Sequence, residues 1–187
     1  GTKGFNQLHL NVLYDLCQRT YLDAEIQPGK QKNEDRAMCH MIDRYRGEKA
    51  VFIADRNYES YNIFAHVEQR GMYYLIRVKD INSSGMLRNM KLPDTGSFDT
   101  DRAFILTRKQ TNAVKAKKEK YRYISHSSPF DYLDLHKNMF YEMSMRIVRF
   151  PISEDSYECI ITNLPRNEFS CEEIKWLYQK RSKTHLL

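Results

Sequence analysis

The 187-residue sequence is poor in residues that interrupt regular structure, with 7 glycines and 5 prolines. Its 13 tyrosines and 9 phenylalanines favour a fold with many strands. No apolar run is long enough to span a membrane, and the first residues lack the charged and apolar segments of a signal peptide. We therefore expect a globular cytoplasmic protein with no membrane partner.

Several motifs that carry chemistry in other proteins are also missing. The four cysteines lie far apart, without the close spacing of a zinc site, so in the cytoplasm they are most simply thiols, buried or at the surface. The six histidines form no H-E-x-x-H motif, the glycines form no phosphate loop, and Ser127 and Ser128 lack the flanking glycines of a nucleophile elbow. This pattern argues against zinc enzymes, P-loop nucleotidases and serine hydrolases.

Positive charge is concentrated in one segment, residues 108–122. The whole chain has a net charge of +6, and this segment alone carries +6 because it holds seven basic residues and one acid, Glu119. Such a patch suits a polyanion, since each neutralised phosphate releases counterions. A solvated lysine-rich loop is the other interpretation that charge alone leaves open. The basic residues of this window are Arg108, Lys109, Lys115, Lys117, Lys118, Lys120 and Arg122.

The first eighty residues alternate between strand and helix patterns. Asn33 is a good helix N-cap, followed by two acids that complement the helix dipole. The run AVFIA at 50–54 is wholly apolar, which predicts a strand buried on both faces. Together with the next helix and strand it forms a unit of about 30 residues, the size of a parallel crossover. We predict strands at 4–16, 21–27, 50–54 and 73–78, and helices at 33–47 and 59–71.

Residues 81–165 have a different sequence pattern, in which short strand-like segments are separated by polar loops. The strands are expected at 103–107, 121–124, 143–151 and 157–162. Ser170 then caps a final helix, with acids in its first turn. We therefore predict an α/β fold made of a mixed core at 1–80, a mainly-β insertion at 81–165, and the start of a last helix at 166–187.

Asp55 is the first candidate for chemistry. It directly follows the apolar run at 50–54, and side chains at the carboxyl ends of parallel strands point into the crevice where α/β sheets bind ligands. A carboxylate there suits Mg²⁺, which prefers oxygen ligands. Capping of the following helix is an equally good interpretation. Glu59 is better explained as an acid in the first turn of that helix.

Several segments resemble the DDE-type transposases of the insertion-sequence 4 family. The strongest are IADRNYESYNIFAHVE at 53–68 and GMYYLIRVKD at 71–80. Others are HLNVLYDL at 9–16, NEDRAMCHMIDRY at 33–45 and RIVRFPISEDSYECIITNLP at 146–165. Two shorter matches, LTRKQTNAVKA at 106–116 and FDYLDL at 130–135, complete the set. The resemblance covers nearly the whole chain up to Arg181, in matching order.

The resemblance implies an RNase H-like core, a mixed sheet with flanking helices, carrying an inserted mainly-β module. It assigns Asp55 as a catalytic acid and metal ligand, within a D-x-G-Y pattern in which Asn57 replaces the glycine. Tyr58 completes that pattern and is expected to contact DNA. The family's last helix carries a Tyr, Arg, Glu and Lys signature: Tyr178 and Arg181 match its first half as DNA contacts, but His185 stands where the glutamate belongs.

The activity implied is cutting and joining of DNA strands by phosphoryl transfer with two Mg²⁺ ions, for which Mn²⁺ can substitute. The partners implied are transposon-end DNA and target DNA, and the intact enzyme could form a homodimer. The implied location is the bacterial cytoplasm, in association with the nucleoid. The basic window would follow the DNA backbone. The family's first aspartate lies upstream of the segment where this chain begins, so we expect this chain alone to be inactive. The alternatives are a non-catalytic nucleic-acid-binding protein and an inactive transposase remnant.

Overall fold

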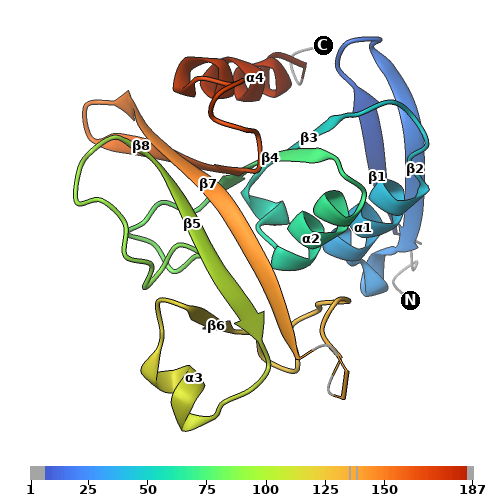
Figure 1. The fold of residues 1–187 in the computed structure, drawn as a ribbon. Helices are drawn as coiled ribbons and strands as arrows, with labels where there is room; N and C mark the ends of the chain where they lie inside the picture. The colour runs from blue at the N-terminus through green and yellow to red at the C-terminus, as the bar shows by residue number, and fades with distance from the viewer. Residues whose placement is uncertain (1–6, 135, 138, 185–187) are drawn as a thin grey trace, which may run out of the picture.

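The computed structural model describes residues 7–134, 136–137 and 139–184. It is a mixed α/β fold with a six-stranded sheet, a separate two-stranded sheet, and helices on both faces of the larger sheet (Figure 1). The helices are α1 (Glu34–Arg44), α2 (Tyr61–Gln69), α3 (Asn112–Ala116) and α4 (Cys171–Thr184). The strands are β1 (Leu8–Asp15), β2 (Thr20–Pro28), β3 (Val51–Ala54), β4 (Tyr73–Val78), β5 (Phe98–Thr107), β6 (Tyr121–Tyr123), β7 (Phe140–Ser153) and β8 (Ser156–Thr162).

The six-stranded sheet has the order β3-β4-β8-β7-β5-β6. β3 and β4 are parallel and joined through α2, as the strand–helix–strand pattern predicted. β4 then pairs antiparallel with β8, from Leu75 opposite Thr162 to Val78 opposite Cys159. The strands of residues 81–165 therefore extend the sheet that β3 and β4 begin. The mixed α/β class is confirmed.

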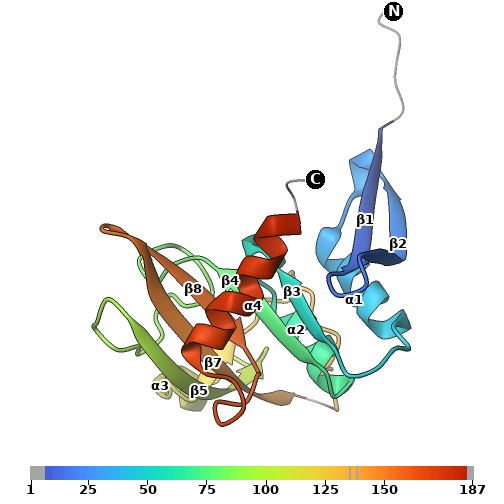
Figure 2. The same ribbon diagram turned by 90° about the horizontal axis from the view of Figure 1, so that it is seen from above.

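Side chains alternate between the two faces of this sheet, and each face has its own core. Tyr74 and Ile76 of β4 are fully buried in the cluster that includes α1 and α2. Leu75 of β4 and Ile160 of β8 point to the opposite face, where they pack with Ile174 of α4. The period of two along β4 thus places helices on both sides of one sheet (Figures 1 and 2).

The β1–β2 hairpin forms its own sheet. Several of its apolar side chains face solvent, whereas in a core-facing hairpin they would be buried. Leu10 and Ile26 lie opposite each other in the register and are 60% and 64% exposed. The face toward α1 is polar: Arg44 of α1 donates to Asp23 at 3.0 Å and to Glu25 at 3.2 Å. The hairpin therefore contacts α1 through ion pairs, and Leu13 of β1 packs against the core cluster that includes α1. Figure 2 shows the hairpin standing beside β3.

The prediction that residues 50–54 form a strand buried on both faces is wrong. β3 is an edge strand, and Val51 and Ile53 are only half-buried. The reason is that the face with α4 is covered only in part, and both side chains pack against the cluster beneath that helix. β1 and β2 pair with each other and not with β3. One backbone edge of β3 therefore has no strand partner within the described residues.

Two buried arginines on β7 bind carboxylates, one of them on β5, which begins at Phe98 and so is longer than the predicted 103–107. Arg146, 3% exposed, donates from Nε and Nη2 to the two carboxylate oxygens of Asp99 on β5, at 2.9 and 2.7 Å. Arg149 binds Asp80 in the same bidentate way, at 2.7 and 2.8 Å. The hydrogen bond from Arg149 lowers the pKa of Asp80. Charge pairing thus accounts for polar residues in a part of β5 that lacks an apolar pattern.

A buried histidine joins α1, α2 and the loop before β7. The His66 ring lies 2.8 Å (Nδ1) from Asp43 Oδ1 of α1 and 2.7 Å (Nε2) from Asp131 Oδ2 of the loop. Asn62 also donates to Asp131, at 2.9 Å. The three groups hold the loop at 131 against the helices.

The helix ends follow the predicted caps. Asn33 Oδ1 accepts from the Arg36 amide at 3.0 Å, and Ser170 and Glu173 form a reciprocal capping box with bonds of 2.7 and 3.3 Å. Gly71, at φ 63°, follows α2 in the left-handed conformation that favours glycine. In the described part of the chain, no helix has both the length and the hydrophobicity needed to cross a bilayer.

Glu68 is an acid of α2 placed in largely apolar surroundings. Its two oxygens lie 3.5 Å from the hydroxyls of Tyr74 and Tyr141. Burial raises the pKa of Glu68 to about 7, although the two tyrosine hydrogen bonds oppose the shift. The folded state therefore favours the protonated carboxyl. Its contribution to stability is present below the unfolded-state pKa of 4.5 and is lost as pH rises through about 7.

We predict that Glu68→Gln stabilises the protein above pH 7, by about 1 kcal/mol, because the amide removes the buried charge. The variant should also lose the part of the pH dependence that falls between 4.5 and about 7. Urea unfolding across this pH range measures both effects, with Glu48→Gln at an exposed position as the control. A Glu68→Gln variant that is less stable than the parent above pH 7 would contradict the assignment.

Candidate active site and nucleic-acid interface

Asp55 lies where the sequence placed it, immediately after the carboxyl end of β3. Its Oδ1 accepts a hydrogen bond from the Asn57 amide at 2.9 Å and so caps the short 3-10 helix Arg56–Tyr58. Asp55 is thus a capping residue, but of this 3-10 helix and not of α2, whose N-cap is Ser60. Its role as a metal ligand stays a prediction.

The second oxygen of Asp55 is bound by α4. Arg181 Nη2 donates to Asp55 Oδ2 at 2.8 Å, and the two side chains are 23% and 30% exposed. Residues that the resemblance treated as separate, a metal ligand and a DNA contact, therefore form one ion pair. The contact is possible because α4 lies across the sheet face next to β3 (Figure 2).

The two tyrosines of the expected site are placed differently from each other. Tyr178 is 4% exposed and packs with Ile174 in the core beneath α4. Burial raises the pKa of its hydroxyl, with Arg181 and Arg77 opposing. Tyr58 is half-buried in the 3-10 helix after Asp55, where burial and the charge of Glu34 raise its pKa. Tyr178 is thus part of the core, whereas Tyr58 lies nearer the surface, close to Asp55.

The described residues do not by themselves form a metal centre. Among them, no group of three or more His, Cys, Asp or Glu side chains is arranged to hold an ion. Asp55 is committed to Asn57 and Arg181, and position 185, the expected place of the last acid, lies outside the described residues. No catalytic step can therefore be assigned to a metal from this arrangement.

The basic window begins directly after β5, includes α3 and reaches into β6, and its seven basic residues fall into two groups. The arginines hold loops: Arg122 donates to the carbonyls of Met86 and Arg88 at 2.8 and 3.2 Å. Arg108 likewise donates to three carbonyls, those of Ser125, Ser128 and Phe130. Most of the lysines face solvent, and those that are exposed are Lys115, Lys117, Lys118 and Lys120.

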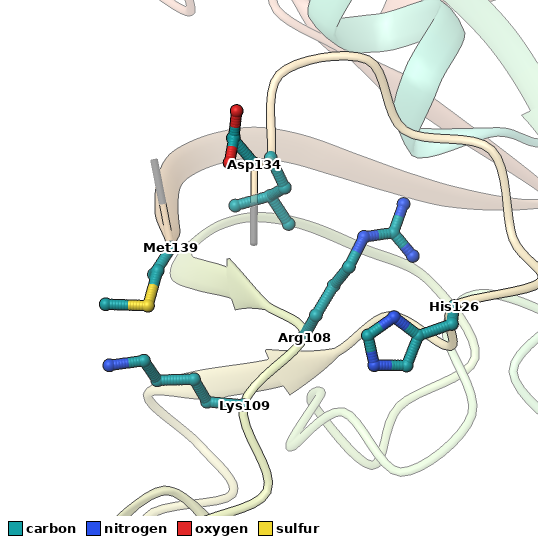
Figure 3. Close-up of a pocket in the computed structure, with 6 residues that line it drawn as sticks. Arg108, Lys109, His126, Asp134 and Met139 are labelled. Carbon is teal, nitrogen blue, oxygen red and sulfur yellow. The ribbon is translucent and has the colours of Figure 1, made fainter. Parts of the chain in front are cut away.

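Lys109 and Arg108 line a cavity of about 110 Å³ that the sequence did not predict. In Figure 3, Lys109 and Met139 lie on one side of it and Arg108 and His126 on the other. Lys109 Nζ also lies 5.1 Å from the centre of the Phe140 ring. Asp134 lines the same cavity, so its charge is mixed.

Asp55 and the basic window lie at opposite edges of the sheet, since β3 is one edge strand and β6 the other. Figure 1 shows α3 and β6 far from α4. The structure thus brings Asp55, Tyr58 and Arg181 together, but not with the basic window. A single DNA path that contacts both regions would have to cross the width of the sheet.

One comparison with known proteins identifies a family. The model of the family described as "Transposase DDE domain" matches residues 1–183. No curated protein matches the chain. The match includes every element described above except the last residue of α4.

We predict that α4 is held on the sheet mainly by apolar contacts and not by the Asp55–Arg181 pair. Ile174 is fully buried, so Ile174→Ala should lower the free energy of unfolding by about 2–5 kcal/mol. In a double-mutant cycle, Asp55→Asn and Arg181→Gln should show a coupling below about 1 kcal/mol, since both side chains are partly exposed. Urea unfolding gives both values. A coupling larger than the Ile174→Ala effect would show that the ion pair dominates.

Proposed function

This chain belongs to the transposase DDE domain family, and from that premise we propose that its parent enzyme cuts and joins DNA strands during transposition. The observation that carries the proposal is the family match over residues 1–183 together with Asp55 at the carboxyl end of β3. We further propose that the chain falls in the insertion-sequence 4 group, on the segments around Asp55 and Arg181. DNA is then the substrate, and a bacterial cytoplasm the setting.

DDE transposases generally use divalent metal ions, and we propose Mg²⁺, replaceable by Mn²⁺, as the ion of the parent enzyme. Asp55 is the one carboxylate that we propose for metal binding. Mg²⁺ wants about six oxygen ligands and loses its waters reluctantly, so a single carboxylate should hold it weakly. A homodimer of the intact enzyme belongs to the same proposal and needs its own measurement.

Arg181 is the partner of Asp55 in this site. Its guanidinium neutralises Asp55 at 2.8 Å, and Arg is well suited to bidentate phosphate binding. We propose that a DNA phosphate competes with Asp55 for Arg181, with Tyr58 beside them. Tyr178 then acts by packing α4 against the sheet, because its ring is buried.

A second candidate function is nucleic-acid binding without cleavage. The observation that favours it is that the exposed lysines of α3 and of the segment between α3 and β6 lie far from Asp55, so they can bind phosphate without it. Cleavage assays distinguish the two functions. An inert protein is the third alternative, and binding measurements at low salt address it.

We predict weak, sequence-independent and salt-sensitive binding to duplex DNA through the basic window. Reversing Lys115, Lys117, Lys118 and Lys120 to Glu should remove most of the binding, since these four side chains are exposed. The slope of log K against log salt should fall by about 0.9 for each phosphate that the variant no longer neutralises. Fluorescence anisotropy over a salt series measures the affinity and its salt dependence. The control variant has the same net charge and carries Glu in place of Lys30, Lys32, Lys49 and Lys137. Unchanged affinity in the first variant would place the DNA path elsewhere.

We predict that this 187-residue chain alone does not nick DNA in Mg²⁺ or Mn²⁺. The reason is that Asp55, the one carboxylate proposed for the metal, is already bound by Arg181. The assay uses end-labelled DNA with the parent chain and Asp55→Ala side by side. Metal-dependent nicking by the parent that disappears in Asp55→Ala would overturn the prediction and at the same time assign Asp55 to catalysis.

A further inference from the structure

A second cavity lies beside β5 and the start of β6, and its charge is strongly positive. Its volume is about 290 Å³, and four basic residues and one acid contribute to its wall. The acid, Glu119, is paired with Lys91 at 3.7 Å. The lining residues are Asn89, Met90, Lys91, Arg102, Ala103, Phe104, Lys118, Glu119 and Arg122.

The two arginines of this cavity are held by hydrogen bonds to backbone carbonyls. Arg122 uses Nη2 for the carbonyls of Met86 and Arg88, at 2.8 and 3.2 Å, so its Nε and Nη1 groups take no part in these bonds. Arg102 Nε donates to the Lys91 carbonyl at 2.8 Å. Side chains held this way lose little conformational entropy when they bind an anion.

The backbone of β5 adds a donor at the same place. β6 pairs with β5 only from Ile105 onward, and the Ile105 amide donates to the Lys120 carbonyl at 2.8 Å. Amides alternate between the two edges of a strand, so the Ala103 amide points to the same edge as that of Ile105. No strand in the described residues pairs with that edge at Ala103.

We propose that this cavity binds one phosphate group of a nucleic-acid strand. Arg122 and Lys118 contact the phosphate oxygens, and the Ala103 amide donates a further hydrogen bond. The volume of about 290 Å³ exceeds the roughly 30 Å³ of one water several-fold, which leaves room for a phosphate with its sugar. The proposal rests on DNA binding by the basic window, and it specifies where in that region a backbone phosphate binds.

A matched pair of lysines tests it. Lys115 and Lys118 are both exposed members of the basic window, but only Lys118 lines the cavity. Lys118→Glu should weaken duplex binding about tenfold more than Lys115→Glu, because a charged hydrogen bond is removed in addition to the shared change in charge. Equal effects in the two variants would overturn the proposal and leave general DNA binding intact.

A neutral substitution removes the remaining ambiguity. Ala103→Phe should fill the cavity without changing the net charge, and it should reduce binding of both DNA and inorganic phosphate. Phosphate titration followed by amide NMR should shift the signals of positions 103 and 118 in the parent chain. The same two signals should not shift in Ala103→Phe. If Ala103→Phe does not fold, the lysine pair alone decides. Full affinity in a folded Ala103→Phe would overturn the site.

The same titration separates this site from the wider function. Phosphate shifts at Ala103 with no DNA binding by the parent chain would contradict the proposed function but leave an anion site. DNA binding without these phosphate shifts would contradict the site alone. Equal affinity for duplexes with and without a 5′-phosphate would assign an internal phosphodiester, and tighter binding of the phosphorylated duplex would assign a strand end.

Discussion

The pairing of β4 with β8 is the constraint on which the rest of the structure depends. β4 binds β3 along one edge and β8 along the other, so a strand from the end of residues 81–165 becomes a neighbour of the core. The Thr162 hydroxyl donates to the Tyr74 carbonyl at 2.5 Å, and Asn163 accepts from the Tyr74 amide at 2.8 Å, which fixes the register where β8 ends. Because α4 is the next element after β8, this register also positions α4 and the Arg181 side chain. Asp55 and Arg181 meet across 126 positions of sequence for that reason.

Local features of the fold could be predicted because their causes are local. Asn33 and Ser170 cap their helices through side chains within three residues, and Gly71 supplies a conformation that depends on its own φ. Sheet membership could not be predicted in this way. Alternation along β1 and β2 shows which residues share a face, but not whether that face meets the core or solvent. The full burial expected for β3 failed because an apolar run does not show how completely a helix covers each face of the strand.

The candidate site was predictable in position and less so in its contacts. The apolar run before Asp55 located the acid correctly, because it depends only on where β3 ends. Charge density located the basic window, but it could not show that Arg108 and Arg122 are bound to backbone carbonyls. Lys91, in the loop before β5, and Arg102, on β5, lie outside the window in sequence and meet it only at the wall of the second cavity. Contacts over such separations come from tertiary packing, which no local pattern encodes.

The polar attachment of the β1–β2 hairpin has a consequence for how the protein opens. Arg44 bridges Asp23 and Glu25 with partly exposed side chains, and contacts of this kind weaken as ionic strength rises. The six-stranded sheet is held instead by apolar packing on both faces, which salt does not screen. The hairpin can therefore separate from α1 as a cooperative unit of its own, at a free energy below that of global unfolding. In moderate salt, amide hydrogens of β1 and β2 would exchange with solvent long before those of β4 and β8.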